Sequence, residues 1–228
     1  MGEFICAGST HSMPSRKARS DTIGFEELAV NPEQIIVEAR KGSDEALGPL
    51  LELYRNYLRL LARIEIGRKL QGKLDASDLV QDTFLEAHRN FYMFQGTDEP
   101  QFASWLRQIL AAKVANLVRH YFGTQGRDVR LEQELAANID NSSRMLGHEP
   151  AASITSPSLQ AVRREQAVLL ADALEQLPED YREVIILRHL ESLTFPEVAR
   201  RMGRTQDSVE KLWLRGLAKL RQVFGELP

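Results

Sequence analysis

Residues 75–91 read DASDLVQDTFLEAHRNF, and residues 102–122 read FASWLRQILAAKVANLVRHYF. The apolar positions of the first stretch recur at steps of four, three and four, which predicts one face of a helix. They are Val80, Phe84, Ala87 and Phe91. The second stretch predicts a basic helix, because no Asp or Glu occurs from residue 100 to residue 126. A basic helix with aromatic residues is suited to following nucleic acid. The alternative is that both are ordinary bundle helices, since helical periodicity reports packing before function.

The composition is that of a folded protein of one or two domains, with 228 residues of which 43% are hydrophobic. Long helix-period runs and few strand signals predict an all-α fold. The net charge of −3 indicates no partner by itself, because a basic patch acts locally. The single Cys6 excludes an internal disulfide and a multi-cysteine zinc site. No apolar run reaches the roughly 18 residues of a membrane span, and the N-terminus lacks the apolar core of a secretion signal. The sequence therefore predicts a cytoplasmic protein without membrane insertion.

Four segments are predicted along the chain. Residues 1–31 are rich in Ser, Gly and Thr, which predicts a flexible N-terminal extension. Residues 32–122 predict a first domain of four helices. Residues 123–158 contain Gly, Pro and more acidic than basic residues, so we expect a flexible linker with only a short helical turn at 131–137. Residues 159–228 predict a second helical domain.

Within the first domain, one continuous helix is expected at residues 43–66, and residues 91–101 are expected to form a loop. Within the second domain, residues 194–221 have the spacing of a helix-turn-helix. Ala199 is small where two helices cross, and Gly203 supplies the turn four residues later. Such a motif places its second helix in a major groove. The same spacing also occurs in ordinary bundles, where helical hairpins are common.

Taken together, the two halves resemble bacterial sigma factors of the sigma-70 family, in the extracytoplasmic-function (ECF) group. The resemblance covers about residues 32–225. Three motifs carry it: residues 75–91 quoted above, the F-x-x-W-L-x-x-I run at 102–109, and LPEDYREVIILRHLESLTFPEVARRMG at 177–203. The family implies two helical domains joined by a flexible linker. The first binds core RNA polymerase and melts the −10 promoter element. The second is a winged-helix-like helix-turn-helix of the sigma region 4 type that binds the −35 element.

The resemblance also implies roles for individual residues. Contacts to the coiled coil of the largest polymerase subunit fall on Asp78, Leu79, Gln81, Asp82 and Leu85. Contacts to the −10 element fall on Phe94, Gln95, Gly96, Arg107, Lys113, Asn116, Arg119 and His120, the first three in a loop that receives a flipped base. Contacts to the −35 element fall on Arg200, Arg201, Arg204, Gln206, Asp207, Glu210, Lys211 and Arg215.

The chain departs from the family pattern at three places. Ser77 stands where the family often has an acid, so phosphorylation of Ser77 or Thr83 is a hypothesis for control. Ala112 lies near a position where Asn is common. Residues 210–212 read Glu-Lys-Leu in place of the usual Lys-Ser-Arg, so the −35 sequence does not follow from the family.

The expected partners are promoter DNA and core RNA polymerase, through its largest-subunit coiled coil and its flap. The sequence leaves open whether an anti-sigma factor or a protein kinase controls the protein. It shows no metal-ligand cluster, phosphate loop or nucleophile motif, so we expect no cofactor, no metal site, no catalytic residue and no enzymatic activity. The alternative function is a helix-turn-helix regulator that acts without polymerase. That alternative leaves residues 75–91 unexplained.

Overall fold

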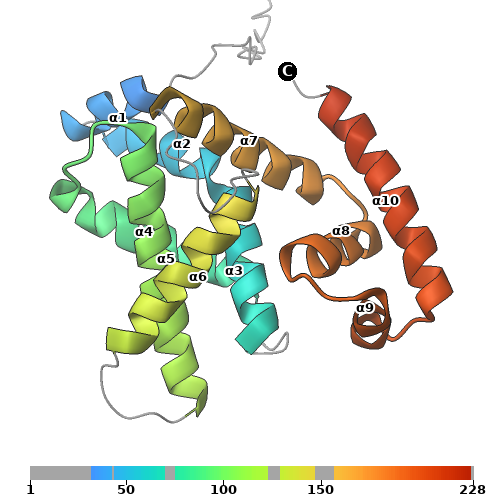
Figure 1. The fold of residues 1–228 in the computed structure, drawn as a ribbon. Coiled ribbons are helices and arrows are strands. Elements are labelled where there is room, and N and C mark those ends of the chain that lie inside the picture. Colours follow the sequence, from blue (N-terminus) through green and yellow to red (C-terminus); the bar gives the residue numbers. More distant parts are fainter. Residues whose placement is uncertain (1–31, 43, 70–74, 123–128, 147–156, 227–228) are drawn as a thin grey trace, which may run out of the picture. The chain divides into compact units, whose positions relative to one another are not determined.

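The computed structural model describes residues 32–42, 44–69, 75–122, 129–146 and 157–226. Every regular element in these ranges is a helix, which confirms the predicted all-α fold (Figure 1). The predicted N-terminal extension, residues 1–31, lies outside the described residues. None of the described helices is long and apolar enough to cross a lipid bilayer.

The first domain contains five α-helices where four were expected. They are α1 (Pro32–Arg40), α2 (Asp44–Leu53), α3 (Arg55–Lys69), α4 (Ala76–Asn90) and α5 (Glu99–Phe122), with a short 3₁₀ turn η1 (Phe91–Met93) after α4. The prediction of one helix at 43–66 was wrong, because the chain leaves the helix at Tyr54. The Tyr54 ring is buried, and its hydroxyl donates to Glu99 Oε1 at 3.1 Å. The same apolar face continues on both sides of the break, through Leu50 and Tyr57, so the periodicity did not reveal it.

Helix α4 begins as predicted. Asp75 is its N-cap, and the carboxylate accepts a hydrogen bond from the Ser77 backbone N–H at 2.8 Å. That backbone hydrogen bond holds the pKa of Asp75 below its usual value. Val80 and Ala87 are buried on the predicted apolar face. The sequence signals for this helix are therefore confirmed at its start and along its core face.

An aromatic cluster fills the core where α4, η1 and α5 meet. Phe102 of α5 is fully buried at its centre. The Phe102 ring centroid lies 5.4 Å from Tyr54, 5.5 Å from Phe94 and 5.9 Å from Trp105. Such ring pairs add stabilisation beyond the area they bury. The cluster fixes the loop after η1 against the first turns of α5.

The expected flexible linker contains an 18-residue helix, α6 (Val129–Leu146). The prediction of a short turn followed by irregular chain was therefore wrong for residues 129–146. Helix α6 lies across α5 (Figure 1) and buries Leu135, Ile139 and Leu146. These residues recur at steps of four and seven, a helical period. The Gly- and Pro-containing flanks on either side hid that period from composition-based reasoning.

The second domain follows the predicted pattern closely. It contains α7 (Pro157–Glu175), α8 (Glu179–Ile185), a π-helical turn η2 (Ile186–Leu190), α9 (Phe195–Met202) and α10 (Gln206–Glu226). Thr194 and Glu197 form a capping box at the start of α9, with the Thr194 N–H donating to Glu197 Oε2 at 2.7 Å. Gly203 ends α9 with φ of 63°, a left-handed conformation that glycine adopts without steric cost. The predicted helix-turn-helix is thus α9, Gly203 and α10.

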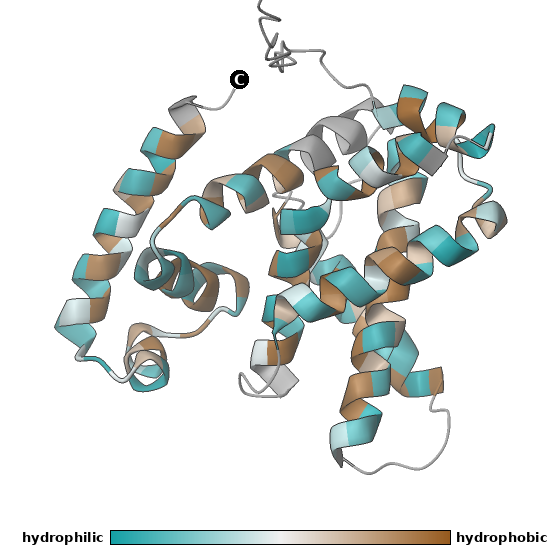
Figure 2. Ribbon diagram, turned by 180° about the vertical axis from the view of Figure 1, so that it is seen from behind, coloured by the Kyte–Doolittle hydropathy of each residue, from teal (hydrophilic) through white to brown (hydrophobic). Residues whose placement is uncertain are grey.

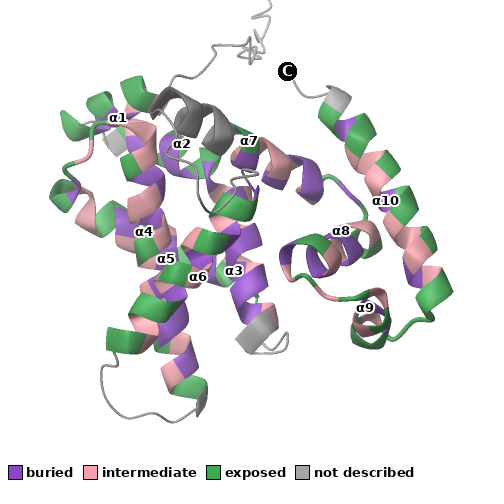
Figure 3. Ribbon diagram, viewed as in Figure 1, coloured by how far each residue is buried: buried purple, intermediate pink, exposed green. Residues whose placement is uncertain are grey.

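Polar pairs join α3 to the helices that follow α6. Asn56 donates to Asp172 of α7 at 2.8 Å, and Arg59 pairs with Glu175 of α7 at 2.8 Å. Burial raises the pKa of Asp172 even though the Asn56 hydrogen bond acts in the opposite direction. Figure 2 shows apolar helix faces turned toward one another, and Figure 3 shows buried residues along α3 and α5.

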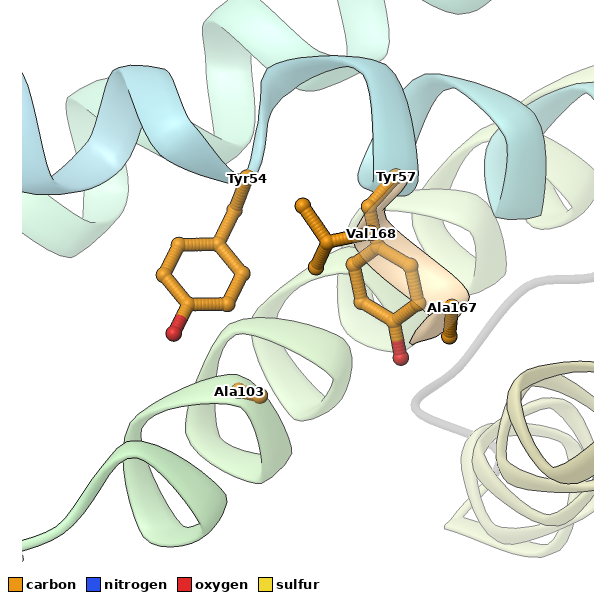
Figure 4. Close-up of a pocket in the computed structure, with 5 residues that line it drawn as sticks. All are labelled: Tyr54, Tyr57, Ala103, Ala167 and Val168. Carbon is orange, nitrogen blue, oxygen red and sulfur yellow. The ribbon is translucent and has the colours of Figure 1, made fainter. Parts of the chain in front are cut away.

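A small cavity lies beside these contacts, between α3, α5 and α7 (Figure 4). Tyr54, Tyr57, Ala103, Ala167 and Val168 line it, and its volume is about 10 Å³. That volume is at the lower limit for one water molecule. The cavity is therefore a packing gap in the core and offers no room for a ligand.

Candidate nucleic-acid interface

The outer face of α4 is acidic and exposed. It carries Asp78, Gln81, Asp82 and a half-exposed Leu85. Leu79, which was predicted on this surface, is 3% exposed and packs in the core, so that assignment is corrected. Leu79 lies next to Val80 and belongs to the same wide apolar face, which the simple step count did not include.

The two residues considered for phosphorylation differ in accessibility. Thr83 is fully buried, and its hydroxyl donates to the Leu79 carbonyl at 2.7 Å. A kinase cannot reach it in the folded helix, so the hypothesis is withdrawn for Thr83. Ser77 is partly exposed in the first turn of α4, and phosphorylation there stays a prediction.

A groove of about 440 Å³ runs between α4 and α5. Its apolar wall includes Met93, Trp105 and Ile109, and its polar wall includes Asn90, Gln108, Lys113 and Asn116. Lys113 Nζ lies 2.9 Å from Glu86 Oε2 across the groove, and this hydrogen bond holds the pKa of Glu86 below its usual value. Aromatic surface beside amide and ammonium donors suits an unpaired base next to its phosphate.

The residues predicted to contact the −10 element separate onto different faces of α5. Lys113 and Asn116 line the groove, and His120 is exposed one turn further along. Arg107 precedes Asn116 by nine residues, which at about 100° per residue places it half a turn away. A count of basic residues along the sequence does not divide them between the faces of α5.

Arg107 and Arg119 are both paired with acids of α6. Arg107 Nε lies 2.6 Å from Asp140 Oδ1, and Arg119 Nη1 lies 3.2 Å from Glu132 Oε1. Their side chains are only 12% and 14% exposed. Both side chains are thus engaged inside the protein, and their contacts to the −10 element stay predictions. Two of the acids that neutralise this basic helix, Glu132 and Asp140, come from the segment that was expected to be a flexible linker, and a third, Glu86, comes from α4.

Phe94 is also placed differently from the prediction. Its ring is 7% exposed and stacks on Phe91 at 5.8 Å, so it belongs to the core and cannot receive a flipped base without leaving it. Gln95 is exposed, and Gly96 is half-buried. Sequence reasoning missed Tyr92, which is 82% exposed, and Met93 on the groove wall. No sequence signal separates these neighbouring aromatic and apolar residues into buried and exposed ones.

Gly96→Ala is expected to disturb this loop, because a Cβ atom at residue 96 would lie 2.3 Å from Phe94 Cζ and 2.8 Å from Gln101 Cβ. The Phe94 ring is confined by the cluster, so the loop has to move. We expect a loss of about 1–3 kcal/mol in the free energy of unfolding, measured by urea denaturation.

Gly48→Ala is the matched control for Gly96→Ala. Gly48 lies in α2, and a Cβ atom at residue 48 would have no other atom within 4 Å, so alanine there should be neutral or stabilising by about 0.4–1 kcal/mol. Equal stability of the two variants would show that the loop accommodates a side chain at residue 96.

The second domain exposes the residues predicted for the −35 element except Glu210, which is half-buried. Arg200 is exposed on α9, Arg204 Nη2 lies 2.7 Å from Asp180 Oδ2, and Arg201 Nη2 donates to the Gly67 carbonyl at 2.6 Å. On α10, Gln206 donates to Glu210 at 2.7 Å, and Lys211 pairs with Asp207 at 2.7 Å. Arg215 is exposed, as is the unpredicted Leu214 at 59%.

Comparison with known proteins agrees with this geometry. Residues 53–122 match the family described as Sigma-70 region 2, and residues 167–220 match Sigma-70, region 4. The chain is 30% identical over 164 residues to RNA polymerase sigma factor CarQ of Myxococcus xanthus, covering 71% of this chain and 82% of the relative. It is 29% identical over 171 residues to the ECF RNA polymerase sigma-E factor of Haemophilus influenzae, covering 75% and 83%.

A solved structure, described as CnrH in complex with the cytosolic domain of CnrY, is 25% identical in sequence. The match covers 86% of this chain and 99% of that one, with a TM-score of 0.32.

The fold and the sequence matches together define a transcription initiation factor, a class of protein that acts without enzymatic chemistry. The chain belongs to the sigma-70 family, as an ECF sigma factor that directs promoter-specific transcription initiation. Within the described residues, no group of three or more His, Cys, Asp or Glu side chains could hold a metal ion.

Proposed function

We propose that this sigma factor binds core RNA polymerase through the outer face of α4. The exposed Asp78, Gln81, Asp82 and Leu85 supply an acidic patch with an apolar residue at its end. Charges on such a patch steer association and fix register, while the leucine adds buried area. The complementary surface on the polymerase is the coiled coil of the largest subunit, as the family resemblance implies.

The groove between α4 and α5 is the proposed site for the opened −10 element. Lys113, which pairs with Glu86 in the free protein, supplies a cation for a phosphate, and Asn116, whose Oδ1 accepts from Arg119, supplies an amide N–H donor for a base edge. The family resemblance assigns Gln95 and Gly96, on the loop after η1, and His120, exposed near the end of α5, to the same element, although they do not line the groove. The observation that carries this proposal is the groove itself, which combines an aromatic wall with amide donors.

The helix-turn-helix is the proposed −35 reader. Arg200, Arg201 and Arg204 flank the turn, where phosphates pass in this motif. The side chains of α10 that then face the major groove are the exposed Gln206, Asp207, Lys211 and Arg215 and the half-buried Glu210. Acidic side chains accept from cytosine N4, so Asp207 and Glu210 favour cytosine at the positions they reach. The domains assigned to these tasks are residues 32–122 and 159–228, separated by the segment 123–158.

Run-off transcription with core polymerase on genomic fragments tests the whole proposal. Defined start sites that depend on this protein are the expected result, and mapping them gives the −10 and −35 sequences. Duplex binding without any effect on polymerase would instead favour a regulator that acts alone. The acidic face of α4 would then have no role in transcription.

Arg200→Ala is expected to weaken −35 binding by a similar factor on every sequence. The side chain is exposed beside the turn and offers a phosphate contact without base information. The slope of log affinity against log salt concentration should decrease by about one unit. Fluorescence anisotropy on several −35 duplexes over a salt series measures both quantities.

The control for Arg200→Ala is Lys41→Ala, which removes an exposed cation after α1 in the other domain. It should leave affinity and slope unchanged. A change of preference at a single base pair in Arg200→Ala would show that Arg200 reads sequence and does not merely hold the backbone.

A further inference from the structure

A ring of hydrogen bonds joins α3, α5 and α6. Arg107 Nε donates to Asp140 Oδ1 at 2.6 Å, and Arg107 Nη1 donates to the Tyr57 hydroxyl at 3.2 Å. The Tyr57 hydroxyl in turn donates to Ser143 Oγ at 2.7 Å. Asp140 and Ser143 are three residues apart, so they are neighbours on one face of α6. Helix α6 is therefore held at two adjacent points, by α5 through Arg107 and by α3 through Tyr57.

The burial around this ring is that of a domain core. Leu135 and Ile139 of α6 are fully buried, and Leu146 is 1% exposed. Tyr57 is 2% exposed, and the Arg107 side chain is 12% exposed. A guanidinium group withdrawn from water requires partners, and the loss of one partner leaves an uncompensated charge. Arg107 thus depends on Asp140 in the folded protein.

The same helix supplies a second acid at its other end, where Glu132 pairs with Arg119. Arg119 also donates to Asn116 Oδ1, so its pair with Glu132 adjoins the groove between α4 and α5, whereas Arg107 is not among the residues that line this groove. A DNA strand in that groove would not need to displace α6. Arg107 and Arg119 thus pair with acids of α6, whereas Lys113 pairs with Glu86 of α4 on the wall of the groove.

We propose that Arg107 is a positioning residue that fastens α6 to the domain that binds the −10 element. The domain then extends to residue 146, beyond the boundary at residue 122 expected from the sequence. The role in promoter binding rests on the function proposed above, whereas the fastening of α6 does not.

The first test measures the ring in the free protein, without DNA. Arg107→Gln and Asp140→Asn should each lower the melting temperature of the full chain by roughly 3–8 °C. The double variant should lose clearly less than the sum of the two, because the residues interact. The exchange of charges in Arg107→Glu with Asp140→Arg should recover at least half of the loss. Additive losses with no recovery would overturn the ring as a structural unit.

The second test uses the full chain with core polymerase on a promoter fragment over a salt series. Arg107→Gln should leave unchanged the slope of log affinity against log salt concentration. The charge-exchanged variant, Arg107→Glu with Asp140→Arg, should restore any affinity for the promoter that Arg107→Gln loses. Lys113→Ala should lower the slope by about one unit. If Arg107→Gln lowers the salt slope and the exchange of charges with Asp140 does not restore it, Arg107 is a phosphate contact. If Asp140→Asn raises the affinity for the promoter more than about threefold and makes the salt slope steeper, α6 competes with DNA. Either result overturns the proposal.

The two tests fail separately. If neither Lys113→Ala nor Arg200→Ala changes promoter binding, the proposed DNA surfaces are wrong, while the melting temperatures still decide whether Arg107 and Asp140 fasten α6.

Discussion

A variant carrying both Asp78→Arg and Asp82→Arg is expected to lose binding to core RNA polymerase while keeping its helix content. Both aspartates are exposed, and they lie four residues apart on one face of α4. The double change reverses two negative charges, so any basic surface that matched them now meets like charge. Like-charge contacts across an interface cost several kcal/mol, which corresponds to a loss of more than about 100-fold in affinity.

The fold should tolerate this change. Neither aspartate is buried, and the described structure uses other residues, Asp75 and Val80, to cap and anchor α4. An arginine in the first turn opposes the helix dipole by only about 0.3–1 kcal/mol. Circular dichroism measures the helix content, and a titration of labelled protein with core polymerase measures the affinity.

The control for this variant is Glu38→Arg with Glu45→Arg, which reverses two exposed charges on α1 and α2. It should retain its affinity for polymerase. If the α4 variant is folded and binds core polymerase as tightly as the parent, α4 is not in the interface.

Phe102→Ala is expected to lower the free energy of unfolding by about 3–5 kcal/mol. Phe102 is fully buried, and four aromatic rings surround it at centroid distances of 5.4–6.4 Å. Alanine removes the central ring and leaves a cavity that the neighbouring rings cannot fill without moving. Because folded domains are stable by only about 5–15 kcal/mol, this loss is a large part of the total. Urea denaturation followed by fluorescence of the neighbouring Trp105 measures it.

Tyr92→Ala provides the comparison within the same segment. Tyr92 is 82% exposed, so its removal should change stability by less than about 0.5 kcal/mol. A loss below about 1 kcal/mol for Phe102→Ala would show that the cluster is loosely packed and does not hold the loop beside the groove.

The sequence predicted best those features that depend on local chemistry. Asp75 at the start of α4, Thr194 at the start of α9 and Gly203 at its end each act on backbone within a few residues. Their effects are visible in a short window, because capping and left-handed turns need only particular residue types at particular offsets. The helix-turn-helix followed from the same kind of signal, and the family resemblance extended it to function.

The features that the sequence missed depend on contacts between distant segments. From the sequence alone, Arg107 is interpreted as a DNA contact, because the sequence does not show that Asp140, 33 residues away, is its hydrogen-bond partner. Phe94 is likewise interpreted as a loop residue that receives a base, because the sequence does not show that Phe102 and Trp105 pack against its ring. Helix α6 is interpreted as linker from the sequence because Gly residues lie on both sides of it and Pro residues follow it, and its stability comes from the face it buries on α5. Each of these errors reflects tertiary packing, which periodicity and composition do not encode.

The docking of α6 on α5 also limits how far apart the two domains can lie. If α6 stays on α5, only residues 147–156 connect it to α7. Ten residues reach at most about 35 Å when fully extended. The −10 and −35 elements lie about 25 base pairs apart by their numbering, or roughly 85 Å at about 3.4 Å per base pair. The part of this distance that residues 147–156 cannot span has to be covered by the width of the two folded domains. The chain then sets an upper limit on the spacing between the −10 and −35 elements, and promoters with a longer spacing exceed its reach.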